Sequence, residues 1–308
     1  MNHPERRQRR SLDAVLLLNK ASGMSSNAAL QASKRLYRAS KAGHAGTLDP
    51  LATGLLPILF GEATKFAAFL LDADKEYLAT VKLGETTTTG DAEGEVIERR
   101  AVSVTNADLE SALTRFRGEI LQTPPMYSAL KRAGRPLYEL ARQGLTVQRV
   151  PRRVVIQELI LRDRQADTVQ LQVRCSKGTY VRTLAEDIGA VLATGGHLTG
   201  LVRQAAGGYR LSQALSLDEL EAMSETERDK RLLSLDGLLA GLLRANLDAD
   251  LARRFRNGQS VAWQAGGAGI YAVYGPSGTL LGLGQPLGDG SLRPVRLTAF
   301  RPDIRASG

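Results

Sequence analysis

Residues 43–54 read Gly-His-Ala-Gly-Thr-Leu-Asp-Pro-Leu-Ala-Thr-Gly and place a single carboxylate, Asp49, on a loop between glycines. Pro50 has a fixed φ and biases Asp49 away from the helical region. Gly46 and Gly54 permit sharp turns and a close backbone approach. Asp-Pro alone is more often a solvated turn, but a rigid loop that presents one acid suits a nucleophile.

The composition bounds the class of protein. The 308 residues suffice for one large domain or two, and 43% of them are hydrophobic. Lys and Arg outnumber Asp and Glu by 41 to 32, a net charge of +9. This balance favours a polyanionic partner such as nucleic acid. An ordinary basic protein can have the same net charge, so the distribution of charge along the chain is the better indicator of such a partner.

Cysteine and histidine usage predicts no metal and a reducing, cytoplasmic location. Cys175 is the single cysteine, so no disulfide forms within the chain. The three histidines are scattered, without the spacing of metal ligands. No apolar run approaches the roughly 20 residues of a membrane span.

Strand and helix patterns alternate irregularly, which predicts the α+β class. Alternating or apolar runs predict strands at 14–18, 77–83 and 169–175, and an edge strand at 55–59 because it contains Pro57. Helices are expected at about 26–37 and 106–116. Thr183 and Glu186 have the spacing of a capping box, which opens another helix.

Residues 131–153 hold seven cations against Glu139 alone, with tyrosines nearby. A basic stripe with aromatics is typical of an RNA-binding face, although a solvated amphipathic helix has a similar pattern. Residues 211–245 are acidic and predict a helical connector. Residues 249–308 have short apolar runs between glycines, the pattern of a small β-barrel.

Five stretches together resemble the TruB family of pseudouridine synthases. They follow in the family's order: the Asp49 loop, Gly-Glu-Ala-Thr-Lys at 61–65, Asp-Lys-Glu-Tyr at 74–77, Pro-Met-Tyr-Ser-Ala-Leu-Lys at 125–131, and Cys-Ser-Lys-Gly-Thr-Tyr-Val-Arg-Thr at 175–183. The resemblance is strong over residues 11–210. One departure is Asn19-Lys20-Ala21, where the family has Asp-Lys-Pro, which puts the local turn geometry in question.

The resemblance implies a mixed, largely antiparallel central sheet flanked by helices, followed by a small barrel-like PUA domain. The expected division is a basic disordered tail at 1–10, a catalytic domain at 11–248 with an RNA-gripping insertion at about 124–153, and a PUA-like RNA-binding domain at 249–308.

The implied activity is isomerisation of uridine 55 in the T-loop of tRNA to pseudouridine. The nucleotide is flipped out of its stack, and Asp49 attacks it. No cofactor is expected, because nothing is oxidised and no group is imported. The implied partner is the T-arm of tRNA, bound by a monomer that needs no protein partner.

The resemblance also assigns roles to single residues. Asp49, Arg182 and Tyr77 are catalytic: Arg182 holds the acid charged, and the Tyr77 hydroxyl is the base if attack occurs at C1′ rather than C6. Sequence leaves that choice of atom open. If residues 180–182 are extended, Tyr180 and Arg182 share a face. The expected substrate contacts are His44, Tyr77, Tyr180, Leu201, Lys20 and Lys131, the last two through phosphates.

Two other functions fit the same features. One is an RNA chaperone that refolds tRNA and whose chemistry is secondary. The other is a guide-RNA-dependent pseudouridine synthase, against which the basic insertion argues, because such an arm grips substrate RNA directly.

Overall fold

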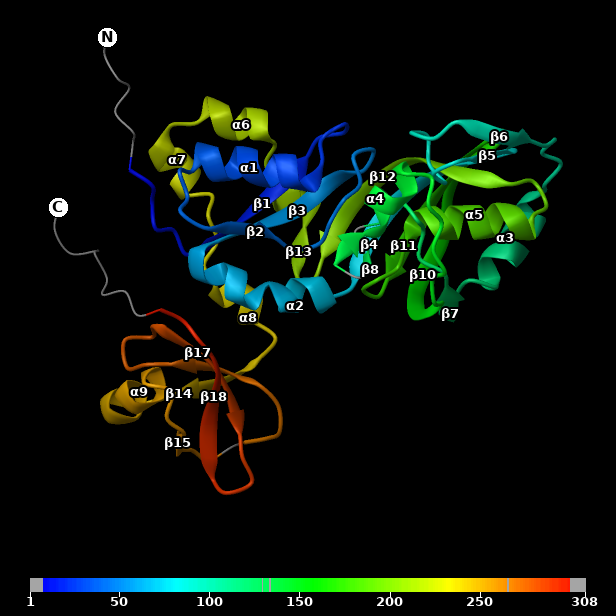
Figure 1. The fold of residues 1–308 in the computed structure, drawn as a ribbon. Helices are drawn as coiled ribbons and strands as arrows, with labels where there is room; N and C mark the ends of the chain where they lie inside the picture. The colour runs from blue at the N-terminus through cyan, green and yellow to red at the C-terminus, as the bar shows by residue number, and fades with distance from the viewer. Residues whose placement is uncertain (1–7, 129, 133, 265, 300–308) are drawn as a thin grey trace, which may run out of the picture.

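The computed structural model describes residues 8–128, 130–132, 134–264 and 266–299. A long mixed sheet runs through the larger part, and a smaller sheet lies beside one end of it (Figure 1). The long sheet has the strand order β1-β3-β12-β4-β11-β10-β7, with β2 beside β3 and β13 beside β12. All pairings are antiparallel except β12 with β3. The expected α+β class and largely antiparallel sheet are confirmed.

Four strands of this sheet, β1, β3, β4 and β11, match the predicted apolar and alternating runs and extend slightly beyond them, and the other strands were not predicted. The bounds of all the strands in this sheet are β1 Ala14–Lys20, β2 Ala42–His44, β3 Thr53–Phe60, β4 Lys75–Leu83, β7 Gly118–Gln122, β10 Arg152–Gln165, β11 Thr168–Cys175, β12 Gly196–Ala206 and β13 Tyr209–Arg210. In β4, buried and half-buried residues alternate, as a period of two requires. β4 lies between β12 and β11, so its side chains occupy the middle of the sheet.

The prediction that residues 55–59 form an edge strand is wrong. β3 lies inside the sheet, between β1 on one side and β2 and β12 on the other. Pro57 is tolerated because two short pairings, with β2 and with β12, share the side of β3 away from β1, and neither includes Pro57. β2 ends opposite Ile58 and β12 reaches only Gly54, while the Pro57 carbonyl accepts a hydrogen bond from Ala45.

Helices cover both faces of the sheet. On one side of β1 lie α1 and the connector helices α6 and α7, and on the other lie α2 and α8 (Figure 1). Helices α3 and α5 lie at the far end. The bounds are α1 Ser26–Leu36, η1 Gly61–Phe66, α2 Ala67–Asp72, α3 Asn106–Thr114, α5 Val181–Val191, η2 Leu211–Gln213, α6 Leu217–Ala222, α7 Glu225–Asp229 and α8 Asp236–Leu239.

Helix α5 begins at Val181, before the predicted capping box at Thr183. Its N-cap is Tyr180, whose side chain makes no capping bond. Gln122 of β7 supplies the contacts instead: its Oε1 accepts from the Tyr180 N–H at 2.7 Å, and its Nε2 donates to the Tyr180 carbonyl at 3.0 Å. A contact from a distant strand thus overrides the local capping pattern.

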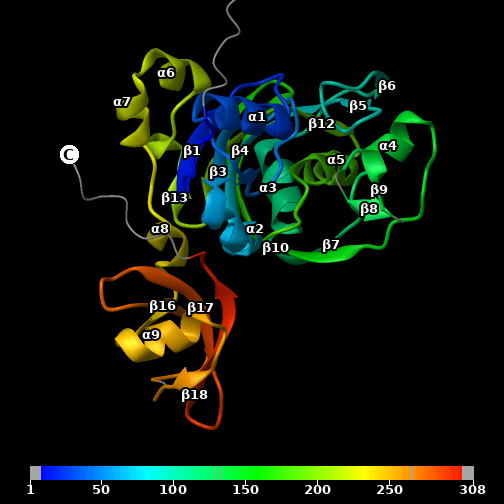
Figure 2. The same ribbon diagram turned by 60° about the vertical axis from the view of Figure 1, so that its left-hand side comes forward.

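The basic insertion forms a small substructure that projects from the body near β7 (Figure 2). It contains β8 Lys131–Arg132, β9 Arg135–Pro136 and α4 Leu137–Arg142. A second small pair, β5 Glu85–Thr87 and β6 Val96–Arg99, stands beside β12. Of the expected basic tail, residues 1–7 lie outside the described residues, and Arg10 forms an ion pair with Asp229 at 2.5 Å.

The C-terminal part builds a five-stranded sheet in the order β14-β16-β17-β18-β15. Its elements are β14 Leu243–Asn246, α9 Ala249–Arg256, β15 Val261–Ala262, β16 Tyr271–Tyr274, β17 Leu280–Pro286 and β18 Ser291–Leu297. Phe255, Val273 and Leu292 belong to its own core. Lys65 ties it to the larger part by donating to the Leu297 carbonyl at 2.9 Å. This sheet is consistent with the expected PUA-like domain.

Candidate active site

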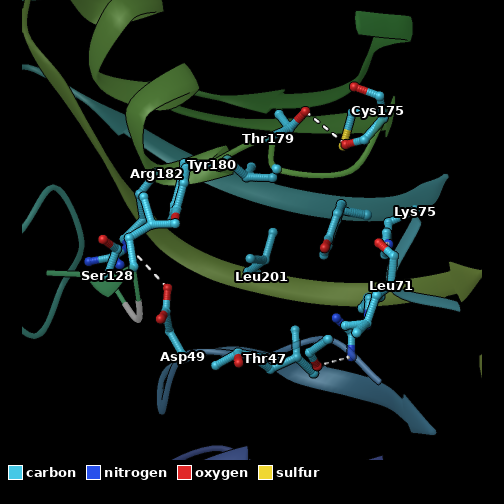
Figure 3. A pocket seen from close by; sticks show the side chains of 18 residues that line it. Thr47, Asp49, Leu71, Lys75, Ser128, Cys175, Thr179, Tyr180, Arg182 and Leu201 are labelled. Atoms are coloured by element: carbon cyan, nitrogen blue, oxygen red, sulfur yellow. Dashed lines mark hydrogen bonds and ion pairs between the residues drawn. The ribbon is translucent and has the colours of Figure 1, made fainter. Parts of the chain in front are cut away.

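A cavity of about 330 Å³ opens between the Asp49 loop, strands β4 and β12, and the start of α5. Figure 3 shows Asp49 and Thr47 on one wall, Tyr180 and Arg182 on the facing wall, Leu201 between them, and Lys75 at the other end. Five of the predicted site residues line this cavity: Asp49, Tyr77, Tyr180, Arg182 and Leu201.

The loop that carries Asp49 is held at both ends by close backbone packing. Gly54 has φ +97°, and a Cβ there would lie 2.5 Å from the Arg203 carbonyl oxygen. Glycine is therefore required where β3 approaches β12. Ser26 of α1 is buried and bonds to both sides of Leu48, donating to its carbonyl at 2.9 Å and accepting from its N–H at 2.8 Å. These contacts fix the backbone one residue before Asp49.

Lys20 supports the same loop from behind. Its side chain is 1% exposed, and its Nζ donates to the carbonyls of Ala21, Met24 and Pro50 at 2.9, 2.6 and 3.4 Å. Burial lowers the pKa of Lys20 to about 8. The expected phosphate contact does not fit this placement, because the amine is turned inward onto the backbone. The chain departs from the family's Asp-Lys-Pro at the two residues that flank Lys20. Lys20 itself is retained, and its contacts are structural.

We expect Lys20→Met to destabilise the protein. The substitution removes the donor to three part-buried hydrogen bonds, and the loss of such bonds reduces the free energy of unfolding by about 1 kcal/mol or more. Thermal unfolding monitored by circular dichroism measures the loss, with the exposed Lys230→Met as the matched control. Equal melting temperatures for the two variants would show that the amine contributes nothing to the loop.

Arg182 joins two carboxylates. Its Nε lies 3.0 Å from Asp49 Oδ2 and its Nη1 3.2 Å from Asp91 Oδ2. It also donates to the carbonyls of Thr89, at 3.1 Å, and Tyr127, at 2.5 Å. The arginine side chain is 5% exposed, so its orientation is fixed on all sides. It lies on the first turn of α5 and not on an extended segment, so the face-sharing argument for Tyr180 and Arg182 is wrong although both reach the cavity.

Burial and the neighbouring charges have opposing effects on the pKa of Asp49. Burial raises the pKa of this carboxyl above its ordinary value, and the charge of Arg182 is the largest opposing effect. Asp91 raises the pKa further and Lys20 lowers it. The ionised form that a nucleophile needs therefore depends on Arg182.

The two predicted tyrosines reach the cavity from different elements. Tyr77 is on β4 and 9% exposed, directly opposite Val173 of β11 and Arg203 of β12. Tyr180 is half-buried at the start of α5, beside Arg182 (Figure 3). Burial raises the pKa of both hydroxyls. Leu201 is on β12 opposite Ala79, and its side chain lies in the middle of the cavity (Figure 3).

His44 faces a second cavity, of about 510 Å³, on the other side of Asp49. Asp49 and Arg182 line both cavities, and Tyr127, Tyr138 and Arg142 line the second one only. Burial lowers the pKa of His44, which favours the neutral ring. Among the described residues its Nδ1 has no hydrogen-bond partner.

Lys131 is not brought to Asp49. It is exposed on β8 and lines a separate cavity of about 430 Å³ together with Arg149 and Arg152. Sequence reasoning missed the ion pair of Asp91 with Arg182, and it missed Arg203, which is buried at the cavity wall. Their signals are weak: Asp91 lies within a polar loop, and Arg203 follows Leu201 by two residues on one strand.

Within the described residues, no group of three or more His, Cys, Asp or Glu side chains is arranged to hold a metal ion. None of the helices in the described part of the chain is long and apolar enough to cross a membrane.

The fold is shared with chains in two solved structures of complexes. A chain in the crystal structure of a Cbf5–Nop10–Gar1 complex superposes with a TM-score of 0.68 at 23% identity, covering 89% of this chain and 78% of that one. A chain in the structure of an H/ACA RNP bound to a substrate RNA containing 2′-deoxyuridine gives 0.69 at 20% identity, covering 94% and 85%. These likenesses show that the chain shares its fold with both structures.

Sequence comparison identifies the family to which the chain belongs. Residues 34–181 match the N-terminal domain of TruB family pseudouridylate synthases, 182–245 match a C-terminal domain of tRNA pseudouridylate synthase B, and 244–298 match the C-terminal domain of pseudouridine synthase II TruB. The chain is 50% identical over 294 residues to tRNA pseudouridine synthase B of Methylobacillus flagellatus, covering 95% of this chain and 97% of that protein. It is 53% identical over 299 residues to that of Burkholderia mallei, covering 95% and 96%. The chain belongs to the TruB family of pseudouridine synthases.

Proposed function

We propose that this protein converts uridine 55 in the T-loop of tRNA to pseudouridine, with Asp49 as the nucleophile. One observation carries the proposal: Asp49 lies at the wall of a cavity, paired with a buried arginine, and two tyrosines line the same cavity. Relatives with half of their residues identical are named tRNA pseudouridine synthase B, which supports tRNA as the substrate.

The cavity suits a base that has left its stack. Flipping a nucleotide costs roughly a few kcal/mol, least where the base is already unpaired. Stacking on aromatic rings returns about 1–3 kcal/mol per base. Tyr77 and Tyr180 supply the rings, and Leu201 supplies an apolar contact in the same cavity. His44, neutral and in the second cavity, is placed to contact the RNA that surrounds the flipped nucleotide.

Two routes lead from this geometry to product. In the first route the Asp49 carboxylate adds to C6 of the uracil, and the bond between C1′ and N1 breaks with its electron pair on the base. The uracil then turns, C5 bonds to C1′, the C5 proton goes to solvent, and the carboxylate leaves C6. In the second route the carboxylate displaces N1 from C1′. The Tyr77 oxygen then takes a proton from C2′, which forms a double bond between C1′ and C2′ and releases the carboxylate. That proton returns to C2′ as C5 bonds to C1′, and the C5 proton goes to solvent. In both routes N1 takes up a proton from solvent, so atoms balance and the product is an isomer of the substrate.

We further propose that the protein grips the T-arm as a monomer with two surfaces outside the cavity. The catalytic domain at 11–248 contributes the basic insertion at about 124–153, where Lys131 and Arg152 are exposed. The C-terminal domain at 249–308 contributes a second RNA contact, and exposed arginines on α9 support this.

We expect Lys131→Ala and Arg152→Ala to weaken tRNA binding and to flatten its salt dependence. Each phosphate contact releases counterions, so each lost contact reduces the slope of log affinity against log salt by about 1. Filter binding at several salt concentrations measures the slope. The exposed Arg231→Ala, on the acidic connector, is the matched control. Slopes equal to that of the control would show that the insertion does not touch RNA.

Purified protein with bare tRNA transcript tests the function. We expect pseudouridine in the transcript without added RNA or protein, and none in a transcript with cytidine at position 55. Activity that requires a guide RNA would favour the guide-dependent alternative. Refolding of tRNA by a protein that forms no pseudouridine would favour the chaperone.

A further inference from the structure

Arg203 is a large buried side chain at the wall of the Asp49 cavity. It lies on β12 and is 1% exposed. Its Nε donates to the Leu55 carbonyl at 2.6 Å and its Nη2 to the Gly46 carbonyl at 3.1 Å. The ion pairs of this site go to Arg182, and within the described part of the chain none joins Arg203 to a carboxylate. Burying a cation without a counter-ion costs free energy, and a negative charge nearby offsets that cost.

The residue directly opposite Arg203 is Tyr77. β12 and β4 are antiparallel, and the register pairs these two residues across the strands. Side chains of such a pair lie on one face of the sheet, close enough to interact. Both line the same cavity. The Arg203 guanidinium therefore donates hydrogen bonds to carbonyls of β3 and of the Asp49 loop, and it lies beside Tyr77.

The electrostatics of Tyr77 depend on this neighbour. Burial raises the pKa of the Tyr77 hydroxyl, and the charge of Arg203 is the largest effect that lowers it, with a hydrogen bond from the same side chain. Cys175 of β11 and Asp49 act in the opposite direction. The other charged groups that line the cavity are Lys75 and Arg182. Arg203 is thus the principal group that favours the deprotonated tyrosine.

We propose that Arg203 is a positioning residue for Tyr77: it holds the hydroxyl at the cavity wall and stabilises the phenolate. The inference rests on the proposed function, in its C1′ route, and deepens it. After Asp49 has displaced N1 from C1′, the phenolate takes the C2′ proton and becomes a phenol, the double bond between C1′ and C2′ forms, and the Asp49 carboxylate leaves C1′. The phenol returns that proton to C2′ when C5 bonds to C1′, so the tyrosine ends in its starting form.

A double-mutant cycle tests the coupling. Single-turnover rates are measured for the parent, Arg203→Gln, Tyr77→Phe and the double variant, with tRNA affinity and melting temperature as controls. We expect Arg203→Gln to slow the parent by about 10²-fold, the range of a lost acid–base contribution. It should slow Tyr77→Phe by less than about 3-fold, because the group it serves is gone. Equal factors in both backgrounds would overturn the proposal, since a general structural defect slows both.

The pH dependence is the second readout and uses Arg203→Lys, which keeps the charge in the event that the glutamine variant does not fold. Below the pKa of Tyr77 the rate follows the phenolate fraction, which falls tenfold for each unit that the pKa rises. A lysine cannot reach both carbonyls and the tyrosine, so we expect a lower rate at neutral pH that recovers as pH rises. A lysine variant with the parent's rate and pH profile would contradict the proposal. A parent protein that forms no pseudouridine would refute the proposed function instead.

Discussion

Asp49→Asn eliminates pseudouridine formation and leaves tRNA binding intact. The amide has nearly the same shape as the carboxylate but is a far weaker nucleophile, and loss of a nucleophile reduces turnover by on the order of 10⁴-fold or more. Binding persists because the basic surfaces lie outside the cavity. Single-turnover assays with excess protein measure the rate, and filter binding measures the affinity.

A matched control separates chemistry from folding. Asp74 is another carboxylate of the larger part and pairs with Arg174 at 3.8 Å on the surface. Asp74→Asn should retain the parent's rate, since exposed ion pairs contribute little. Product formation by Asp49→Asn at the rate of Asp74→Asn would remove Asp49 from the mechanism.

Arg182→Gln slows the reaction by about 10²–10³-fold at neutral pH, the effect of losing one preorganised electrostatic contact. Two buried or half-buried carboxylates, Asp49 and Asp91, are then left without their cation. The charge of Arg182 opposes the rise that burial causes in the pKa of Asp49. Without it that pKa rises further, so less of the nucleophile is ionised.

The direction in which the pH profile of the Arg182→Gln variant moves follows from the pKa of Asp49. A carboxyl with a raised pKa ionises only as pH increases, so the acidic limb of the rate profile should move to higher pH. Single-turnover rates measured across the acidic and neutral pH range would show the shift. Arg174→Gln, at the surface, is the control. A profile that drops uniformly without moving would show that Arg182 does not act through the charge of Asp49.

Much of the fold was predictable because the decisive patterns are local. The apolar run of β1, the alternation of β4 and the Ser25 cap of α1 each depend on a few neighbouring residues. The predictions were wrong where contacts with a distant segment determine the local structure. Pro57 sits inside the sheet because two partner strands share one side of β3. The start of α5 is set by Gln122, from another strand.

The candidate site follows the same rule. Motifs brought Asp49, Tyr77, Tyr180 and Arg182 to attention, and the structure gathers all four around one cavity. The Arg203–Tyr77 pair depends on the register of β12 against β4, which no motif contains. The burial of Lys20 depends on carbonyls that converge from separate turns.

A structure of the protein bound to a tRNA T-arm tests the central claim most directly. The account predicts uridine 55 turned out of the loop, its base between Tyr77 and Tyr180, and an Asp49 oxygen within about 3.5 Å of C1′ or C6, the range of a near-attack geometry. A uridine that remains stacked in its loop, or a base bound away from the Asp49 carboxylate, would contradict it.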